Sequence, residues 1–177
     1  MGKEEKFELA RLATYYENTF CGRNCLIQTN YKKAPTIQIS FAINQLPHLL
    51  GLHYVSKKTP TKIIKDIYTE KMTISTIERH KDYNYIKYRI LGFYSLSSIL
   101  LSPRSDLCIL GKDLRSNPMK LSLVLFDNQT LDKGKIIILG LKKSSRNDVY
   151  YPATLIRDDY YKYEDLRKTG INNIAWI

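Results

Sequence analysis

The sequence predicts an α+β fold, in which N-terminal and middle helices pack on a C-terminal antiparallel β-sheet. Residues 1–102 show mainly helical spacing of apolar side chains, interrupted by a short hairpin. Residues 103–177 instead hold short runs rich in Ile, Val and Leu, with turn residues between them. Because helices come first and strands follow as a block, an alternating parallel arrangement is not expected. The length of 177 residues fits a single domain spanning 1–177.

The first expected elements are a helix and a hairpin. Residues 3–20 place apolar side chains near helical spacing, and Gly22 follows as a stop signal. Residues 26–30 and 36–42 are expected to pair as two strands, because the second run alternates polar and apolar side chains.

A histidine-containing turn, residues 46–53, comes next and holds His48 and His53, two of the three histidines of the chain. Asn44 can cap a short helix, Pro47 fits its first turn, and Gly51 can end it with a positive φ. Imidazole exchanges protons near neutral pH, so these side chains are candidates for proton transfer. The alternative is a pair of packed histidines with structural roles.

Three helices are expected in the middle of the chain, over residues 61–68, 73–81 and 83–101. The dipeptide Ser102-Pro103 ends the last of them, because the residue before a proline avoids the helical conformation. This middle part is strongly basic. Its candidates for nucleic-acid binding are Lys57, Lys58 and Lys62.

The last third of the chain is expected to form the sheet. Turns are expected at residues 127–128 and 132–134, and a polar loop at 142–148 that carries Lys142, Lys143 and Arg146. A short helical piece is expected at 160–167. The expected strands are residues 107–110, 120–126, 135–141, 150–156 and 171–177.

The charge of the chain predicts an anionic partner. The formal net charge is +11, and 14 tyrosines accompany the lysines. Such a field attracts nucleic acid or an acidic protein, and tyrosines can stack on bases. RNA is therefore the expected partner. A composition inherited from an AT-rich genome is the alternative explanation.

Other features point to a reduced, cytoplasmic protein without a membrane segment. The first six residues lack an apolar signal core, and the longest apolar run is too short to cross a bilayer. Three cysteines and three histidines do not have the spacing of a zinc site. We expect no metal and no cofactor.

The remaining inventory suits one reaction class. The sequence lacks a Walker loop, a dinucleotide-binding glycine cluster, a nucleophile elbow and clustered carboxylates. RNA cleavage without a metal needs a base for the 2′-OH, an acid for the 5′-oxygen and cations for the phosphorane. His48 or His53 could be base or acid, with Lys142, Lys143 or Arg146 as the cationic clamp.

Three motifs also resemble a known family. Residues 46–53 resemble its Pro-His-Leu-x-Gly-Leu motif, and residues 139–141 with 150–154 resemble its Leu-Gly-Leu and Tyr-Pro-x-Thr motif. Between them, the segment from Arg89 to Leu101 is similar to the family pattern. The family is a phage-associated branch of the Barnase–EndoU–colicin–RelE nuclease superfamily, and the resemblance spans residues 7 to about 158.

The resemblance implies a Barnase-like endoribonuclease of phage or mobile-element origin, which acts without a metal in toxin-like or conflict roles. It places His48, Tyr151 and Thr154 at or near the site, with His53 and Arg146 as neighbours. The C-terminal strands lack the histidine or glutamate that several members of the superfamily carry there. The alternatives are therefore a non-catalytic phage protein that binds nucleic acid or inhibits a host defence complex, and an interaction domain for an acidic partner such as an antitoxin.

Overall fold

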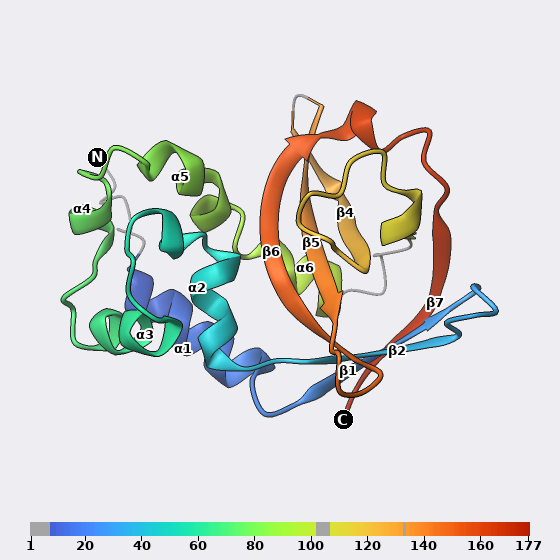
Figure 1. Ribbon diagram of the computed structural model, residues 1–177, viewed down its shortest axis with the longest axis horizontal. Coiled ribbons are helices and arrows are strands. Elements are labelled where there is room, and N and C mark those ends of the chain that lie inside the picture. The colour runs from blue at the N-terminus through green and yellow to red at the C-terminus, as the bar shows by residue number, and fades with distance from the viewer. Residues whose placement is uncertain (1–7, 102–106, 133) are drawn as a thin grey trace.

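The computed structural model describes residues 8–101, 107–132 and 134–177 (Figure 1), of which 107–108 and 127–132 are described by backbone alone. The described residues form six α-helices and a seven-stranded sheet, so the predicted α+β class is confirmed. The helices are α1 (Leu9–Phe20), α2 (Leu46–Leu49), α3 (Pro60–Tyr68), α4 (Ile74–Ile77), α5 (Tyr83–Leu91) and α6 (Ser95–Leu101). The strands are β1 (Asn24–Thr29), β2 (Thr36–Ser40), β3 (Leu107–Leu110), β4 (Leu123–Asp132), β5 (Lys135–Lys143), β6 (Val149–Asp159) and β7 (Thr169–Trp176).

The sheet curls until it closes on itself, in the order β1-β2-β6-β5-β4-β3-β7. All neighbouring strands pair antiparallel except β2 and β6, which run parallel. The expected hairpin forms from β1 and β2, and it joins the C-terminal sheet through β6 and β7. Long-range pairing of this kind leaves no local signal in a sequence, so the hairpin's place in the sheet was not predicted.

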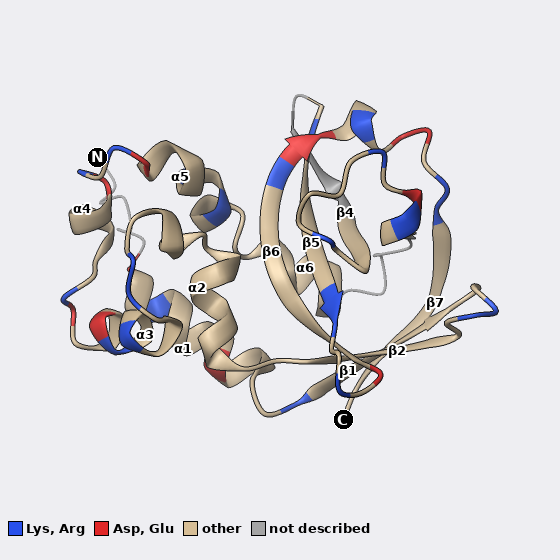
Figure 2. Cartoon of the chain, viewed as in Figure 1, with Lys and Arg blue, Asp and Glu red and all other residues tan. Residues whose placement is uncertain are grey.

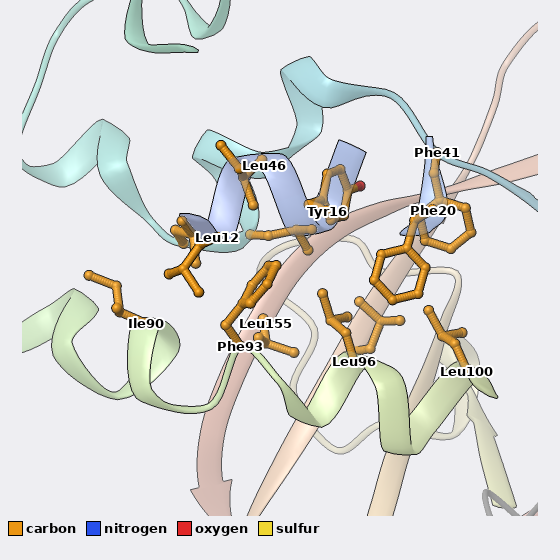
Figure 3. Packing of buried hydrophobic residues seen from close by; sticks show 14 of the residues in the cluster. Leu12, Tyr16, Phe20, Phe41, Leu46, Ile90, Phe93, Leu96, Leu100 and Leu155 are labelled. Carbon is orange, nitrogen blue, oxygen red and sulfur yellow. The ribbon is translucent and has the colours of Figure 1, made fainter. Parts of the chain in front are cut away.

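Helices α1 to α5 form one half of the molecule and the sheet the other, with β6 at the boundary and α6 packed on β4 and β5 (Figure 1). Side chains of α1, α5 and α6 pack with β6 into the larger hydrophobic cluster (Figure 3). A smaller cluster fills the inside of the curled sheet and includes Phe126 and Ile138. Labelled members of the larger cluster in Figure 3 are Leu12, Tyr16, Phe20, Phe41, Leu46, Ile90, Phe93, Leu96, Leu100 and Leu155.

Several expectations are corrected by the structure. The expected helix over 83–101 is broken at Gly92, because α5 packs along β6 whereas α6 packs under β4 and β5. The expected turn at 127–128 lies within β4, and the hairpin turn follows Asp132. Lys142 and Lys143 end β5 rather than begin the loop. The piece expected over 160–167 is a single 3₁₀ turn, Tyr160–Lys162.

Two expectations concern residues that the structure does not describe, and one helix is shorter than expected. Residues 3–7 of the expected first helix and the expected stop at 102–103 lie outside the described residues. The helix expected over 73–81 is shorter, because only α4 is helical there. The side chain of Thr73 accepts a hydrogen bond from the Thr76 N–H and so caps the start of this short helix.

Candidate active site at the edge of strand β6

The histidine turn is anchored by its leucines and projects its histidines outward. Leu46, Pro47 and Leu49 are buried, so the intervening His48 of α2 points to the solvent side. Pro47 lies in the first turn of the helix, as expected. Gly51 follows with φ 71°, and the 3₁₀ turn Leu52–Tyr54 then carries His53. The predicted left-handed stop at Gly51 is therefore confirmed.

Two hydrogen bonds to the Gln45 side chain, rather than the expected Asn44 cap, fix the start of the turn. The hydroxyl of Tyr16 in α1 donates to Gln45 Oε1 at 3.2 Å, and the Ala42 N–H donates to the same oxygen at 3.0 Å. The side chain of Asn44 makes no cap hydrogen bond. The Asn44 prediction was wrong because a 3₁₀ turn, Ile43–Gln45, precedes α2 and places Asn44 inside it.

The two histidines lie next to each other on the surface. Their ring centroids are 5.5 Å apart, and the ring of Tyr54 lies 4.3 Å from that of His53. His48, His53 and Tyr54 are all exposed. Both imidazoles can therefore reach an external ligand, which excludes the alternative of two packed core histidines.

The surroundings of His53 favour its neutral form. Partial burial lowers the pKa of His53 below 6.5, and the nearby charges of His48 and Arg89 act in the same direction. A histidine with a lowered pKa is mostly unprotonated at neutral pH and can accept a proton.

Arg89 of α5 joins the histidine turn to the sheet. Its Nη1 donates to Thr154 Oγ1 of β6 at 2.9 Å, and its guanidinium carbon lies 5.6 Å from the centroid of the Tyr54 ring. Burial lowers the pKa of Arg89, whereas its interactions with Tyr54 raise it. A guanidinium retains its charge under such shifts, so the site contains a fixed, half-buried cation.

Two glycines of the sequence motifs make room for this arrangement. A Cβ atom at Gly51 would lie 2.9 Å from Ile86 Cγ2 and 3.0 Å from Arg89 Cδ. A Cβ atom at Gly140 would lie 2.8 Å from Thr154 Cγ2. A side chain at either motif glycine would therefore collide with one partner of the hydrogen bond between Arg89 and Thr154.

The site lies beside an unpaired stretch of β6. Among the described residues, β2 pairs with β6 only at Val149 and Tyr150. Beyond this point α2 and α5 pack against β6. A β-bulge between Gly140 and Leu141 also shifts the register opposite Pro152, a residue that bulges and strand edges tolerate. Bulges often lie near active sites, where they redirect side chains.

The predicted site residues separate into groups. His48 and His53 contact each other, and Thr154 reaches them through Arg89 and Tyr54. Thr154 is fully buried, whereas Tyr151 of the same strand is 37% exposed. Arg89 was absent from the predicted site, although the motif that contains it was noted. The sequence signal that could have identified Arg89 is its position, as a charged residue, between the apolar helix residues Ile86 and Ile90.

The predicted cations lie on two other parts of the surface. Lys142 and Lys143 pair in register with Tyr151 and Tyr150 near the β5–β6 loop, which also carries the exposed Arg146. Lys143 forms an ion pair with Asp148 at 2.8 Å. Lys57, Lys58 and Lys62 follow the histidine turn, are exposed, and Lys58 pairs with Asp66. None of these cations shares a hydrogen bond, ion pair or ring contact with the histidines in the described part of the chain.

A further hollow lies away from the histidine turn, and the described residues hold no metal cluster. Within residues 8–101, 107–132 and 134–177, no three His, Cys, Asp or Glu side chains are grouped as metal ligands, and no helix combines the length and the apolar character of a membrane span. A hollow of about 930 Å³ lies between α1, α3, α4 and α5. Its lining includes Glu8, Glu70 and Glu78 and excludes both histidines of the turn.

Comparison with known proteins identifies one family. The family model described as phage-Barnase-EndoU-ColicinE5/D-RelE like nuclease4 matches residues 8–175. No curated protein and no solved structure matches the chain.

Proposed function

Because the chain belongs to this phage-associated Barnase-EndoU-ColicinE5/D-RelE like nuclease family, we propose that it is an endoribonuclease that acts without a metal. The observation that carries the proposal is the contact between two exposed imidazoles beside a half-buried arginine. This arrangement supports the proposal, because the two imidazoles would serve as acid and base and the guanidinium as the cation that the reaction needs.

In the proposed reaction, neutral His53 removes the proton of the ribose 2′-OH. The 2′-oxygen attacks the adjacent phosphorus, and the bond from phosphorus to the 5′-oxygen breaks. Protonated His48 gives its proton to the leaving 5′-oxygen, so the products are a 2′,3′-cyclic phosphate and a 5′-hydroxyl. The assignment of His53 as base rests on its lowered pKa.

Arg89 is proposed to stabilise the negative charge of the phosphorane. A guanidinium has five N–H donors, more than the interactions of Arg89 with Thr154 and Tyr54 require. Such donors suit the oxygens of a phosphate. Thr154 is fully buried and is proposed to position Arg89, whereas the partly exposed Tyr151 is proposed to contact substrate.

The predicted cations are proposed to bind the RNA backbone on both sides of the site. Lys57, Lys58 and Lys62 would contact phosphates beyond the histidine turn. Lys142, Lys143 and Arg146 would do so at the β5–β6 loop. The support is their charge and accessibility: lysines and arginines occur on both the helical half and the sheet (Figure 2).

The test is cleavage of single-stranded RNA in excess EDTA by wild type, His48→Ala and His53→Ala. His80→Ala is the matched control, because His80 lies beside Asp82 and outside the site. We expect EDTA-resistant cleavage that leaves 2′,3′-cyclic phosphate ends, is lost in both site variants and persists in the control. Cleavage that EDTA abolishes, or that survives both substitutions, contradicts the mechanism.

A second candidate is a non-catalytic phage protein that binds nucleic acid or blocks a host defence complex. The net charge of +11 and the absence of a histidine or glutamate from the C-terminal strands favour it. It predicts intact RNA and salt-sensitive binding that His48→Ala leaves unchanged. In either case we place the protein in the host cytoplasm with RNA, and an acidic antitoxin or host complex is the protein partner that its charge would suit.

A further inference from the structure

Three tyrosines beside the histidines expose their rings to solvent. Tyr54 is 46% exposed, and Tyr85 and Tyr88 of α5 are 70% and 48% exposed. Tyr88 and Arg89 follow Tyr85 by three and four residues and therefore lie on the same side of the helix as Tyr85. The opposite face of α5 is buried through Ile86 and Ile90. Large exposed aromatic rings grouped on one surface mark an interaction site.

Two of these rings, Tyr54 and Tyr85, extend the histidine pair into a continuous aromatic row. From His53, the row passes to Tyr54 at 4.3 Å and then to Tyr85 at 6.1 Å between ring centroids. Successive rings are tilted by only 37° and 30°. The row thus presents several similarly oriented ring faces next to the proposed reacting groups.

Two arginines border the row on the side of the sheet. Arg89 lies over the Tyr54 ring, and Arg157 of β6 lies over the Tyr88 ring at 5.0 Å from its centroid. The ligand of this surface should therefore combine flat apolar faces with negative charge. An unpaired nucleotide strand has both, since each nucleotide carries a base and a phosphate.

We propose that Tyr54, Tyr85 and Tyr88, here called the tyrosine row, stack on unpaired bases next to the cleaved phosphate. The proposal rests on the proposed nuclease function and assigns its substrate class as single-stranded RNA rather than duplex. In an RNA duplex the bases are paired and stacked on one another, and the deep major groove hides them from side chains. Stacking on the tyrosine row requires free base faces.

The first test is binding, measured separately from cleavage. The probe is a short fluorescent RNA strand with 2′-O-methyl riboses, which lack the attacking hydroxyl, compared with its duplex. Wild type should bind the single strand more tightly. Tyr85→Leu and Tyr88→Leu should each weaken single-strand binding by about tenfold, the effect of losing one stacked base.

Two variants control for structure and chemistry. Tyr85→Phe keeps the ring and should bind like wild type. Tyr161→Leu removes a 62% exposed tyrosine of the 3₁₀ turn after β6, outside the row, and should also bind like wild type. Unchanged thermal unfolding of Tyr85→Leu, whose ring is largely exposed, confirms that the variant folds.

A second test identifies the base that stacks on Tyr85. Single abasic positions are introduced along the probe and combined with Tyr85→Leu. At the position that stacks on Tyr85, the two changes together should cost no more than either alone, because both remove the same contact. Additive losses at every position overturn the proposal.

The two proposals fail in different ways. In one outcome, wild type cleaves RNA but binds single strand and duplex with equal affinity, and Tyr85→Leu changes neither affinity. The tyrosine row then does not bind bases, and a protein partner is the remaining candidate ligand for it. If wild type leaves RNA intact but the tyrosine variants lose single-strand binding, the row is confirmed and the nuclease mechanism is wrong.

Discussion

At the residue scale, the two histidines differ in the environment that surrounds them. His53 lies between His48 and Tyr54 and close to Arg89, and burial together with its interactions with His48 and Arg89 lowers its pKa. Two chemically identical side chains, five residues apart, can therefore take opposite roles. The direction of the pKa shift of His53 determines which role we assign to it.

This assignment predicts the acid limb of the pH–rate profile. The base must be neutral, so kcat/KM falls as the pH drops through the pKa of His53. Because that pKa is lowered, the midpoint of the acid limb should lie below 6.5. Substituting Arg89 by Gln removes a nearby positive charge and should move the midpoint upward. A midpoint above 6.5 in wild type contradicts His53 as the base.

Thr154 tests whether positioning of Arg89 matters. Thr154→Val keeps the shape but removes the acceptor of the Arg89 hydrogen bond, which should cost about 1 kcal/mol in the free energy of unfolding. We expect kcat to fall by about tenfold with KM little changed, as for a loss of transition-state stabilisation. Thr154→Ser retains the hydroxyl and should recover most of kcat. Equal activity of the Val and Ser variants would show that the hydrogen bond is only structural.

At the element scale, the site depends on how three short elements meet. α2 and the following 3₁₀ turn hold the histidines, α5 supplies Arg89, and β6 supplies Thr154. None of these elements is long, so tertiary packing rather than intrinsic helix stability fixes their positions. The close contact of Gly51 with Ile86 and Arg89 is where α5 meets the histidine turn.

Gly51 and Gly22 form a matched pair for testing this contact. Both have positive φ, 71° and 73°, but a Cβ atom at Gly22 would meet nothing within 4 Å. Gly22→Ala should therefore lose about 1–2 kcal/mol in the free energy of unfolding from backbone strain alone. Gly51→Ala should lose more in urea unfolding, because Ile86 and Arg89 must also shift.

The Gly51→Ala and Gly22→Ala variants should also differ in cleavage rate. Displacement of Arg89 in Gly51→Ala should reduce the cleavage rate by about tenfold or more, given the sensitivity of catalysis to misplaced groups. Gly22→Ala should cleave like wild type. If both variants lose equal stability and equal activity, the contact with Arg89 has no catalytic role.

At the scale of the whole molecule, we expect the positive charge to govern binding of the proposed RNA substrate. The net charge of +11 is spread over both halves, as Figure 2 shows. When many cations of a protein bind phosphates, counterions are released from the nucleic acid. The logarithm of the binding constant therefore falls linearly with the logarithm of the salt concentration. The slope of this line counts the phosphates that are contacted.

Two sets of substitutions should show how much each basic surface contributes to that slope. Neutralising Lys57, Lys58 and Lys62 together, or Lys142, Lys143 and Arg146 together, should each make the slope shallower by about one for every phosphate that the variant no longer neutralises. The cleavage rate at saturating RNA should change little, because neither set contacts the histidines. A slope that neither set alters would exclude both surfaces from the RNA path.

Local patterns in the sequence determined much of the candidate site. Pro47 and Gly51 bound a turn whose leucines face inward, so the exposed position of His48 follows from the spacing of apolar residues. The hairpin expected over 26–30 and 36–42 was likewise readable from alternation, and the C-terminal strands from runs rich in Ile, Val and Leu between turn residues. These features depend on neighbours within a few residues, which a sequence displays directly.

Tertiary structure alone decided which distant residues meet. The break at Gly92, the parallel pairing of β2 with β6, and the hydrogen bond between Arg89 and Thr154 depend on segments far apart in the chain. The tyrosine row likewise combines Tyr54 with Tyr85 and Tyr88 of α5. Such contacts arise from packing of whole elements, and no local pattern encodes them. Candidate residues for the site were therefore visible in the sequence, whereas the geometry that brings them together was not.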